Sequence, residues 1–178
     1  MSEDTLGSIG PTLNGLLNGE LQAAHIYMQA GAWCGARSLD GCSTFLLDHS
    51  TEELMHMRKF LDYMIDVDLQ PSFAALPEPK ITVEHVRDLF ELILEHERKV
   101  TRNIYAAASE AQAIGDQGTF EFLQWFIMEQ REEEKTFREL VDRTKLIGDG
   151  PHTLYYIDKE VTEIAARLAA ASASPAAA

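Results

Sequence analysis

The segment LNGLLNGELQAAHIYMQAGAWC, residues Leu13–Cys34, decides the fold, because its apolar residues recur with the 3.6-residue period of a helix. This period predicts a buried stripe of Leu13, Leu16, Glu20, Ala24, Tyr27, Gly31 and Cys34. A carboxylate, Glu20, therefore stands near the middle of an otherwise apolar face. An isolated ionised carboxylate in a protein core is strongly destabilising, so Glu20 must be paired, protonated or bound to a metal ion.

Three further segments repeat this feature. Their stripes are Phe45, His49, Glu53, His56, Phe60, Tyr63, Val67; then Val86, Phe90, Ile93, Glu97, Val100, Ile104; then Leu123, Phe126, Gln130, Glu133, Phe137, Leu140, Thr144. Glu53, Glu97 and Glu133 interrupt these apolar faces as Glu20 interrupts the first. No lysine or arginine lies on the stripes to neutralise the carboxylates, so the pattern predicts bound metal cations.

Composition narrows the class of protein. The chain has 178 residues, enough for one well-buried core. Its formal net charge of −14 argues against nucleic acid and anionic membranes as partners and favours small cations. The acidic start MSEDTLGSIG does not resemble a signal peptide, and no run reaches the length of a membrane span. Cys34 and Cys42 match neither a zinc-knuckle nor a redox CxxC spacing. We therefore expect a cytoplasmic protein with reduced thiols.

Apolar period and helix-breaking residues place five helices in an all-α fold. The expected ranges are 11–37, 43–68, 83–114, 119–147 and 153–170, with Pro11 in the first turn of the first helix. The link QPSFAALPEPKI, residues 70–81, contains three prolines and cannot be helical throughout.

The length of this link decides the topology. Helices of about 26 residues are roughly 40 Å long, and about a dozen extended residues span that distance. The link therefore crosses the length of a four-helix bundle made of two antiparallel hairpins. Residues 1–170 are expected to form this domain, with its short fifth helix, and 171–178 a flexible Ala/Ser-rich tail.

The two hairpins repeat one motif. Glu53 follows Glu20 by 33 residues and begins Glu53-x-x-His56; Gln130 follows Glu97 by the same 33 and begins Gln130-x-x-Glu133. Residues i and i+3 share a helix face, so both side chains can reach one metal ion. A glutamate facing a Glu-x-x-His motif, used twice, is the dinuclear pattern of ferritin-like bundles. The altered second motif predicts two unequal metal positions. One imidazole among oxygen ligands suits iron or manganese.

At these residues the chain resembles the non-haem bacterial ferritins over nearly its whole length. The stretches that carry the resemblance are NGELQAAHIYMQAGAWC (18–34), EELMHMRKFLDY (52–63), FLQWFIMEQREEEKTF (122–137) and LYYIDKE (154–160). The resemblance implies iron storage and detoxification in a hollow homo-oligomeric shell of about 24 subunits. Oxygen or hydrogen peroxide would oxidise Fe(II) at a ferroxidase centre of two irons within each subunit, and the shell would hold the ferric mineral.

The resemblance also implies the role of each site residue. One iron position takes Glu20, Glu53 and His56; the other takes Glu53, Glu97 and Glu133, with Gln130 nearby. A third iron position takes Glu52, Glu129, Glu132 and Glu133. Tyr27 matches a tyrosine that supplies an electron to the oxidant, and Trp125 is a second possible donor. No haem is expected, because Leu54 stands where a bacterioferritin needs methionine. His49, one turn before Glu53, is interpreted as a core histidine, and a role in supporting the metal ligands is the alternative.

Two other functions stay open. One is a di-iron or di-manganese oxidase or peroxidase that retains its metals and needs no shell; the Gln130-x-x-Glu133 departure argues against it. The other is a shell subunit whose metal site is structural or vestigial, and the intact ligand set argues against that.

Overall fold

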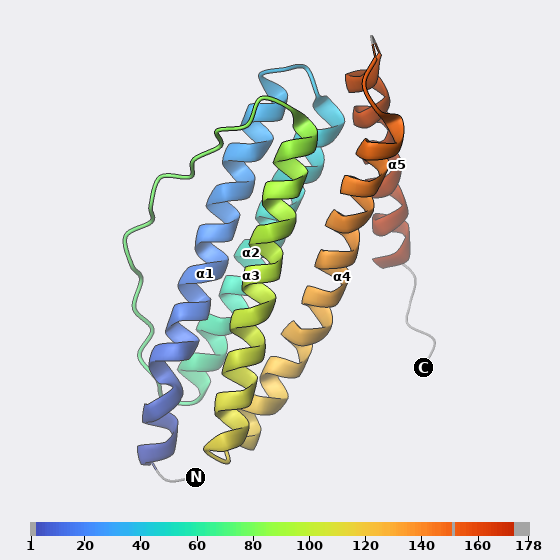
Figure 1. The fold of residues 1–178 in the computed structure, drawn as a ribbon. Coiled ribbons are helices and arrows are strands. Elements are labelled where there is room, and N and C mark those ends of the chain that lie inside the picture. The colour runs from blue at the N-terminus through green and yellow to red at the C-terminus, as the bar shows by residue number, and fades with distance from the viewer. Residues whose placement is uncertain (1–2, 151, 173–178) are drawn as a thin grey trace.

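In the computed structural model, residues 3–150 and 152–172 are described, and they form five helices (Figure 1). Their bounds are α1 (Glu3–Gly35), α2 (Asp40–Asp66), α3 (Val86–Ala113), α4 (Gln117–Ile147) and α5 (Thr153–Ser172). α1 pairs with α2 and α3 with α4, and α5 lies against α2 and α4 at one end of the bundle. The predicted all-α bundle with a fifth C-terminal helix is confirmed. None of the described helices combines the length and the apolar character needed to cross a lipid bilayer.

The first helix begins earlier than predicted. α1 starts at Glu3, so Pro11 lies inside the helix and not in its first turn. An internal proline lacks the amide that bonds the carbonyl four residues back, which costs about 3 kcal/mol. Ile9 and Leu13 are fully buried on either side of Pro11, and their burial favours continuing the helix through the proline. At the other end of the chain α5 continues to Ser172. The remainder of the predicted tail, 173–178, lies outside the described residues.

The link between α2 and α3 runs the length of the bundle beside α1, as predicted (Figure 1). Two asparagines of α1 hold its first part. Asn14 Oδ1 accepts the amide of Ser72 at 2.7 Å, and Asn18 Oδ1 accepts the amide of Ala74 at 2.7 Å. Asn18 Nδ2 also donates to the carbonyl of Ser72 at 2.9 Å. Side chains of α1 therefore satisfy backbone groups that a non-helical segment leaves unpaired.

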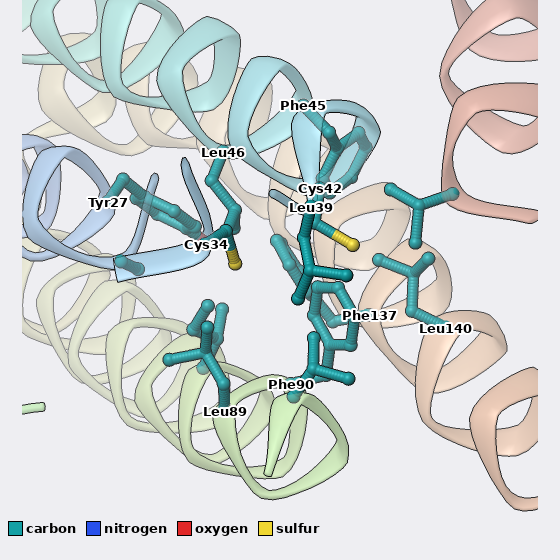
Figure 2. Close-up of a cluster of buried hydrophobic side chains, with 14 of the residues drawn as sticks. Tyr27, Cys34, Leu39, Cys42, Phe45, Leu46, Leu89, Phe90, Phe137 and Leu140 are labelled. Carbon is teal, nitrogen blue, oxygen red and sulfur yellow. The ribbon is translucent and has the colours of Figure 1, made fainter. Parts of the chain in front are cut away.

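The apolar core consists of two clusters. The larger lies towards the α1–α2 turn and gathers aromatic and aliphatic side chains from the bundle helices and from α5, among them Tyr27, Phe45, Phe90 and Phe137 (Figure 2). Cys34 and Cys42 are part of it, and both are buried and free. The smaller cluster includes Leu13, Phe60, Ile104 and Phe126. Between them lies a buried layer of polar residues: Glu20, Glu53, His56, Glu97, Gln130 and Glu133.

α5 is attached to the bundle through a carboxylate. Asp158 accepts the amides of Gly41 at 3.0 Å and Cys42 at 2.8 Å, so it caps the first turn of α2. The residue that precedes α2, Leu39, provides no side-chain cap of its own. A negative charge at a helix N-terminus is favourable, because the first amides have no partner within the helix. Gly41 permits the close approach: a Cβ there would lie 2.6 Å from the carbonyl oxygen of Asp158.

We predict that Asp158→Ala lowers the free energy of unfolding by about 1–2 kcal/mol, because it leaves two helix amides without their acceptor. Urea unfolding followed by circular dichroism measures this. Asp149→Ala, which removes a carboxylate from an exposed position near the start of α5, is the matched control. Equal urea midpoints for the two variants would contradict the assignment of Asp158 as a cap.

Candidate metal centre

One half of the buried polar layer comes from the first hairpin. Nδ1 of His56 lies 3.4 Å from Glu53 Oε2 and 3.8 Å from Glu20 Oε2. One ligand atom from each of these three residues lies within 4.8 Å of the other two. The i, i+3 spacing turns Glu53 and His56 to the same face of α2, and the antiparallel hairpin brings Glu20 of α1 opposite them. The structure therefore joins the three residues predicted for the first metal position.

The second hairpin completes the layer with Glu97 of α3 and with Gln130 and Glu133 of α4. Tyr27 donates its hydroxyl to Glu97 Oε1 at 2.6 Å. Three buried carboxylate oxygens have no hydrogen-bond partner among the described residues: Glu20 Oε2, Glu97 Oε2 and Glu133 Oε2. Buried polar atoms are nearly always satisfied, so this many orphaned oxygens in one layer fit the ligand set of a cation site. Oxygen donors with one imidazole fit iron or manganese.

The electrostatics of the layer lead to the same conclusion. Burial raises the pKa of Glu20, Glu53, Glu97 and Glu133 above the ordinary glutamate value. Repulsion adds to this effect, because the charge of Glu53 raises the pKa of Glu20 further, and the charge of Glu97 does the same for Glu133. Four carboxylates carry four negative charges, which two divalent cations would balance. Burial also raises the pKa of Tyr27, which keeps its hydroxyl protonated as a donor.

Gln130 is held by a residue that the sequence patterns did not single out. Its Oε1 accepts from Thr101 Oγ1 at 3.1 Å, and the same hydroxyl lies 3.0 Å from the carbonyl oxygen of Glu97. Gln130 and Thr101 are both buried. Burial raises the pKa of Glu97, whereas Tyr27 and Gln130 lower it. The structure thus places Gln130 beside Glu97, as predicted, with its carbonyl oxygen turned towards Thr101. Thr101 is one helical turn after Glu97, and that spacing was the available signal.

A second group of possible ligands lies beside this layer. One ligand atom from each of His49, Glu52 and Glu133 lies within 4.8 Å of the others. They border a cavity of about 570 Å³ between α2, α4 and α5. Glu129 and Glu132, the other residues predicted for a third iron, also line this cavity, but Glu132 is exposed and pairs with Lys135 at 2.8 Å. His49 was interpreted as a core histidine, and it is indeed buried against Phe45.

The two predicted electron donors lie in different parts of the centre. Tyr27 is fully buried and reaches Glu97. Trp125 of α4 is partly exposed, and its ring lies edge-on to His56 with 5.4 Å between the centroids. The ammonium of Lys59 lies over the Trp125 ring, 4.3 Å from its centroid. Tyr27 therefore lies beside Glu97, and Trp125 lies beside His56.

Known proteins are similar to this chain in both sequence and structure. Residues 12–147 match the family model of the ferritin-like domain. The bacterial non-heme ferritin of Campylobacter jejuni is 37% identical over 153 residues, covering 86% of this chain and 92% of that protein. The bacterial non-heme ferritin of Escherichia coli is 36% identical over 152 residues, with 85% and 92% covered. An open pore ferritin from Archaeoglobus fulgidus superposes with a TM-score of 0.84 at 30% identity, over 91% of this chain and 96% of that chain.

We predict that the metal-free protein loses stability as the pH rises. Folding raises the pKa of such a carboxylate above its value near 4.5 in the unfolded chain. The protonated carboxyl therefore favours the folded state fully below pH 4.5, and this stabilisation is lost as the pH rises through the raised pKa. The free energy of unfolding should therefore fall from about pH 5 towards neutrality, by up to about 1.4 kcal/mol per pH unit for each such group. Glu20→Gln should flatten this slope, as urea unfolding in a chelating buffer would measure. A slope unchanged by Glu20→Gln would contradict the prediction.

We predict that Thr101→Val lowers the free energy of unfolding of the metal-free protein by about 1–3 kcal/mol, because it leaves the buried Oε1 of Gln130 without a donor. Thr101→Ser keeps the hydroxyl and is the matched control. Both variants are compared with the unchanged protein by urea unfolding. If valine is tolerated as well as serine, the hydroxyl does not hold Gln130.

Proposed function

The chain belongs to the ferritin family, and from this premise we propose that it stores iron, oxidising Fe(II) to Fe(III) at the buried carboxylate layer of each subunit. One observation carries the proposal. Four carboxylates and an imidazole are buried in one layer, and three of the carboxylate oxygens have no hydrogen-bond partner in the part of the chain that the structure describes. A purely structural role would leave this charge uncompensated in the core.

Fe(II) is the substrate of this reaction. Glu20, Glu53 and His56 bind one ion, and the close approach of His56 Nδ1 to both carboxylates supports this set. Glu97 and Glu133, with Glu53 shared, bind the second. Hard oxygen ligands favour the more highly charged ion, so the layer stabilises Fe(III) over Fe(II). Each Fe(II) gives one electron to oxygen or hydrogen peroxide.

The protein residues around the layer position ligands and move protons. Tyr27 fixes Glu97 through its hydrogen bond, and the 2.6 Å separation gives the phenolic proton an acceptor if the ring gives up an electron. Trp125 is the second donor, since its ring contacts that of the ligand His56. Gln130 offers no charge to the second position. The two positions therefore differ, because the first has an imidazole, His56, among its ligands and the second has only carboxylates.

The further parts of the proposal rest on the relatives. A cytoplasmic homo-oligomeric shell of about 24 subunits would enclose the mineral. Domain 1–170 forms the subunit, and no haem takes part. A third iron position lies at the cavity that Glu52, Glu129, Glu132 and Glu133 border. Acidic walls there favour cations on their way to or from the inner layer.

The proposal is tested by adding a large excess of Fe(II) to the metal-free protein in air and measuring iron per subunit after size exclusion. We expect many soluble irons per subunit, eluting with a large assembly. Retention of only the inner pair on a monomer or dimer, with the rest precipitated, would show instead an enzyme that keeps its metals.

The same experiment on the double variant Glu53→Ala/His56→Ala tests the assignment of the site. Loss of an outer-shell partner already costs a metal site about 10–100-fold, so removing two ligands should slow Fe(II) oxidation by more than about 100-fold. The variant should still elute as a large assembly, because the apolar clusters remain. Oxidation at the original rate would refute the ligand assignment.

A further inference from the structure

Both tryptophans of the chain carry a cation over the ring. The guanidinium carbon of Arg37 lies 3.8 Å from the centroid of Trp33, and the ammonium of Lys59 lies 4.3 Å from that of Trp125. We propose that Lys59 raises the one-electron reduction potential of Trp125, so that Tyr27 gives up an electron before Trp125 does. The order of the two donors rests on the proposed function, whereas the effect of Lys59 on Trp125 is a property of the metal-free protein.

The charge over the Trp125 ring carries the first step. The negative face of a neutral indole attracts an ammonium, which favours the reduced ring. Removal of one electron makes the indole a radical cation, so the same ammonium then repels it. Lys59 of α2 reaches Trp125 of α4, and in the described part of the chain no carboxylate pairs with Lys59. No direct partner therefore neutralises the charge that acts on the ring.

The packing of Trp125 carries the second step. The indole is 40% exposed, and it packs edge-on against His56 and Phe126, with 5.4 and 4.8 Å between the ring centroids. Partial burial reduces the screening of a nearby charge by water. A cation bound to His56 would add a second positive charge beside the same ring. Both charges make Trp125 harder to oxidise.

Carboxylates near the indole act in the opposite direction. Three of them line the cavity of about 550 Å³ that Trp125 borders: Asp62, Asp66 and Glu121. Asp62 is already paired with Arg58 at 2.8 Å, which offsets its charge. The ammonium of Lys59 is the charge that contacts the ring face. Because the interaction between charges weakens with distance, we expect the ammonium to outweigh the carboxylates.

Tyr27 has a carboxylate where Trp125 has an ammonium. The hydroxyl of Tyr27 donates to Glu97 at 2.6 Å. An acceptor at this distance allows the phenol to pass its proton to Glu97 as its electron leaves, so the product is a neutral radical and a protonated carboxyl. Oxidation of Trp125 instead places a positive charge beside Lys59. Tyr27 is therefore the easier of the two side chains to oxidise.

Chlorine dioxide tests the effect of Lys59 on the metal-free, full-length protein. It is an uncharged oxidant that takes one electron from an indole and becomes chlorite, and the indole radical cation then loses its N–H proton to water. Peptide mapping by mass spectrometry gives the oxidation rates of Trp125 and Trp33 separately. Lys59→Met, which removes the charge but keeps a long side chain, should speed Trp125 oxidation by about threefold or more. Lys59→Arg keeps a cation and should stay within about twofold of the unchanged protein.

The matched control is Arg58→Met, because Arg58 is the exposed neighbour of Lys59 on α2 and its loss changes the net charge equally. It should leave the rate at Trp125 within about twofold. Salt separates a charge effect from easier access to the ring. Raising the ionic strength to about 1 M shortens the screening length to about 3 Å, so it should speed Trp125 oxidation in the unchanged protein but not in Lys59→Met.

Three results would overturn the inference: an unchanged Trp125 rate in Lys59→Met, an equal rise in Arg58→Met, or a rate in the unchanged protein that does not respond to salt. The order of donors is then tested by peptide mapping after oxidation of excess Fe(II) with hydrogen peroxide. Lys59→Met should carry more oxidised Trp125 than the unchanged protein, and equal amounts would refute the order. Absence of any iron oxidation would count against the proposed function and would not alter the chlorine dioxide result.

Discussion

Four carboxylates buried in one layer repel each other, and the rest of the structure depends on how that repulsion is contained. The layer lies between two apolar clusters, so its charges cannot move apart without opening the bundle. Burial raises the pKa of every member, and Glu97 accepts a hydrogen bond from a neutral side chain, the hydroxyl of Tyr27. The apolar clusters stabilise the bundle. Their stability offsets the cost of burying carboxylates whose charge and oxygen atoms the rest of the protein does not compensate. A layer held in this way has the charge and the unpartnered oxygens that a cation site requires.

The inner layer could be predicted from the sequence because helical period determines which residues share a face. Glu20, Glu53 and His56 meet in the structure as their spacing indicated. The period does not determine how a side chain is turned. His49 is buried among aromatic rings, as a core histidine would be, yet its Nε2 faces Glu133, and only the position of the Phe45 carbonyl shows this. The predicted start of α1 near residue 11 was wrong. The preference of proline for the first turn of a helix was outweighed by the burial of Ile9 and Leu13. These are tertiary effects that no local pattern contains.

The two hairpins have the same arrangement of candidate ligands but differ in the residue types. In the first, an imidazole stands beside two carboxylates; in the second, the corresponding residues are an amide and a carboxylate, and Thr101 holds the amide. A symmetric site would bind both cations with similar strength. The asymmetric one presents an imidazole on α2 and an additional carboxylate, Glu133, on α4. Glu133 also borders the cavity between α2, α4 and α5, so the second half of the layer adjoins that cavity.

The cap that Asp158 places on α2 also has a consequence for biosynthesis. The carboxylate and the amides it accepts are 116 and 117 residues apart in the chain. Because a ribosome delivers the N-terminal part first, α2 must wait for its cap until nearly the whole chain has emerged. The inner ligands, from Glu20 to Glu133, are all synthesised before α5. A nascent chain can thus bring its carboxylate layer together while the wall of the adjoining cavity is still missing, and Glu133 stays open to solvent until the last helix docks.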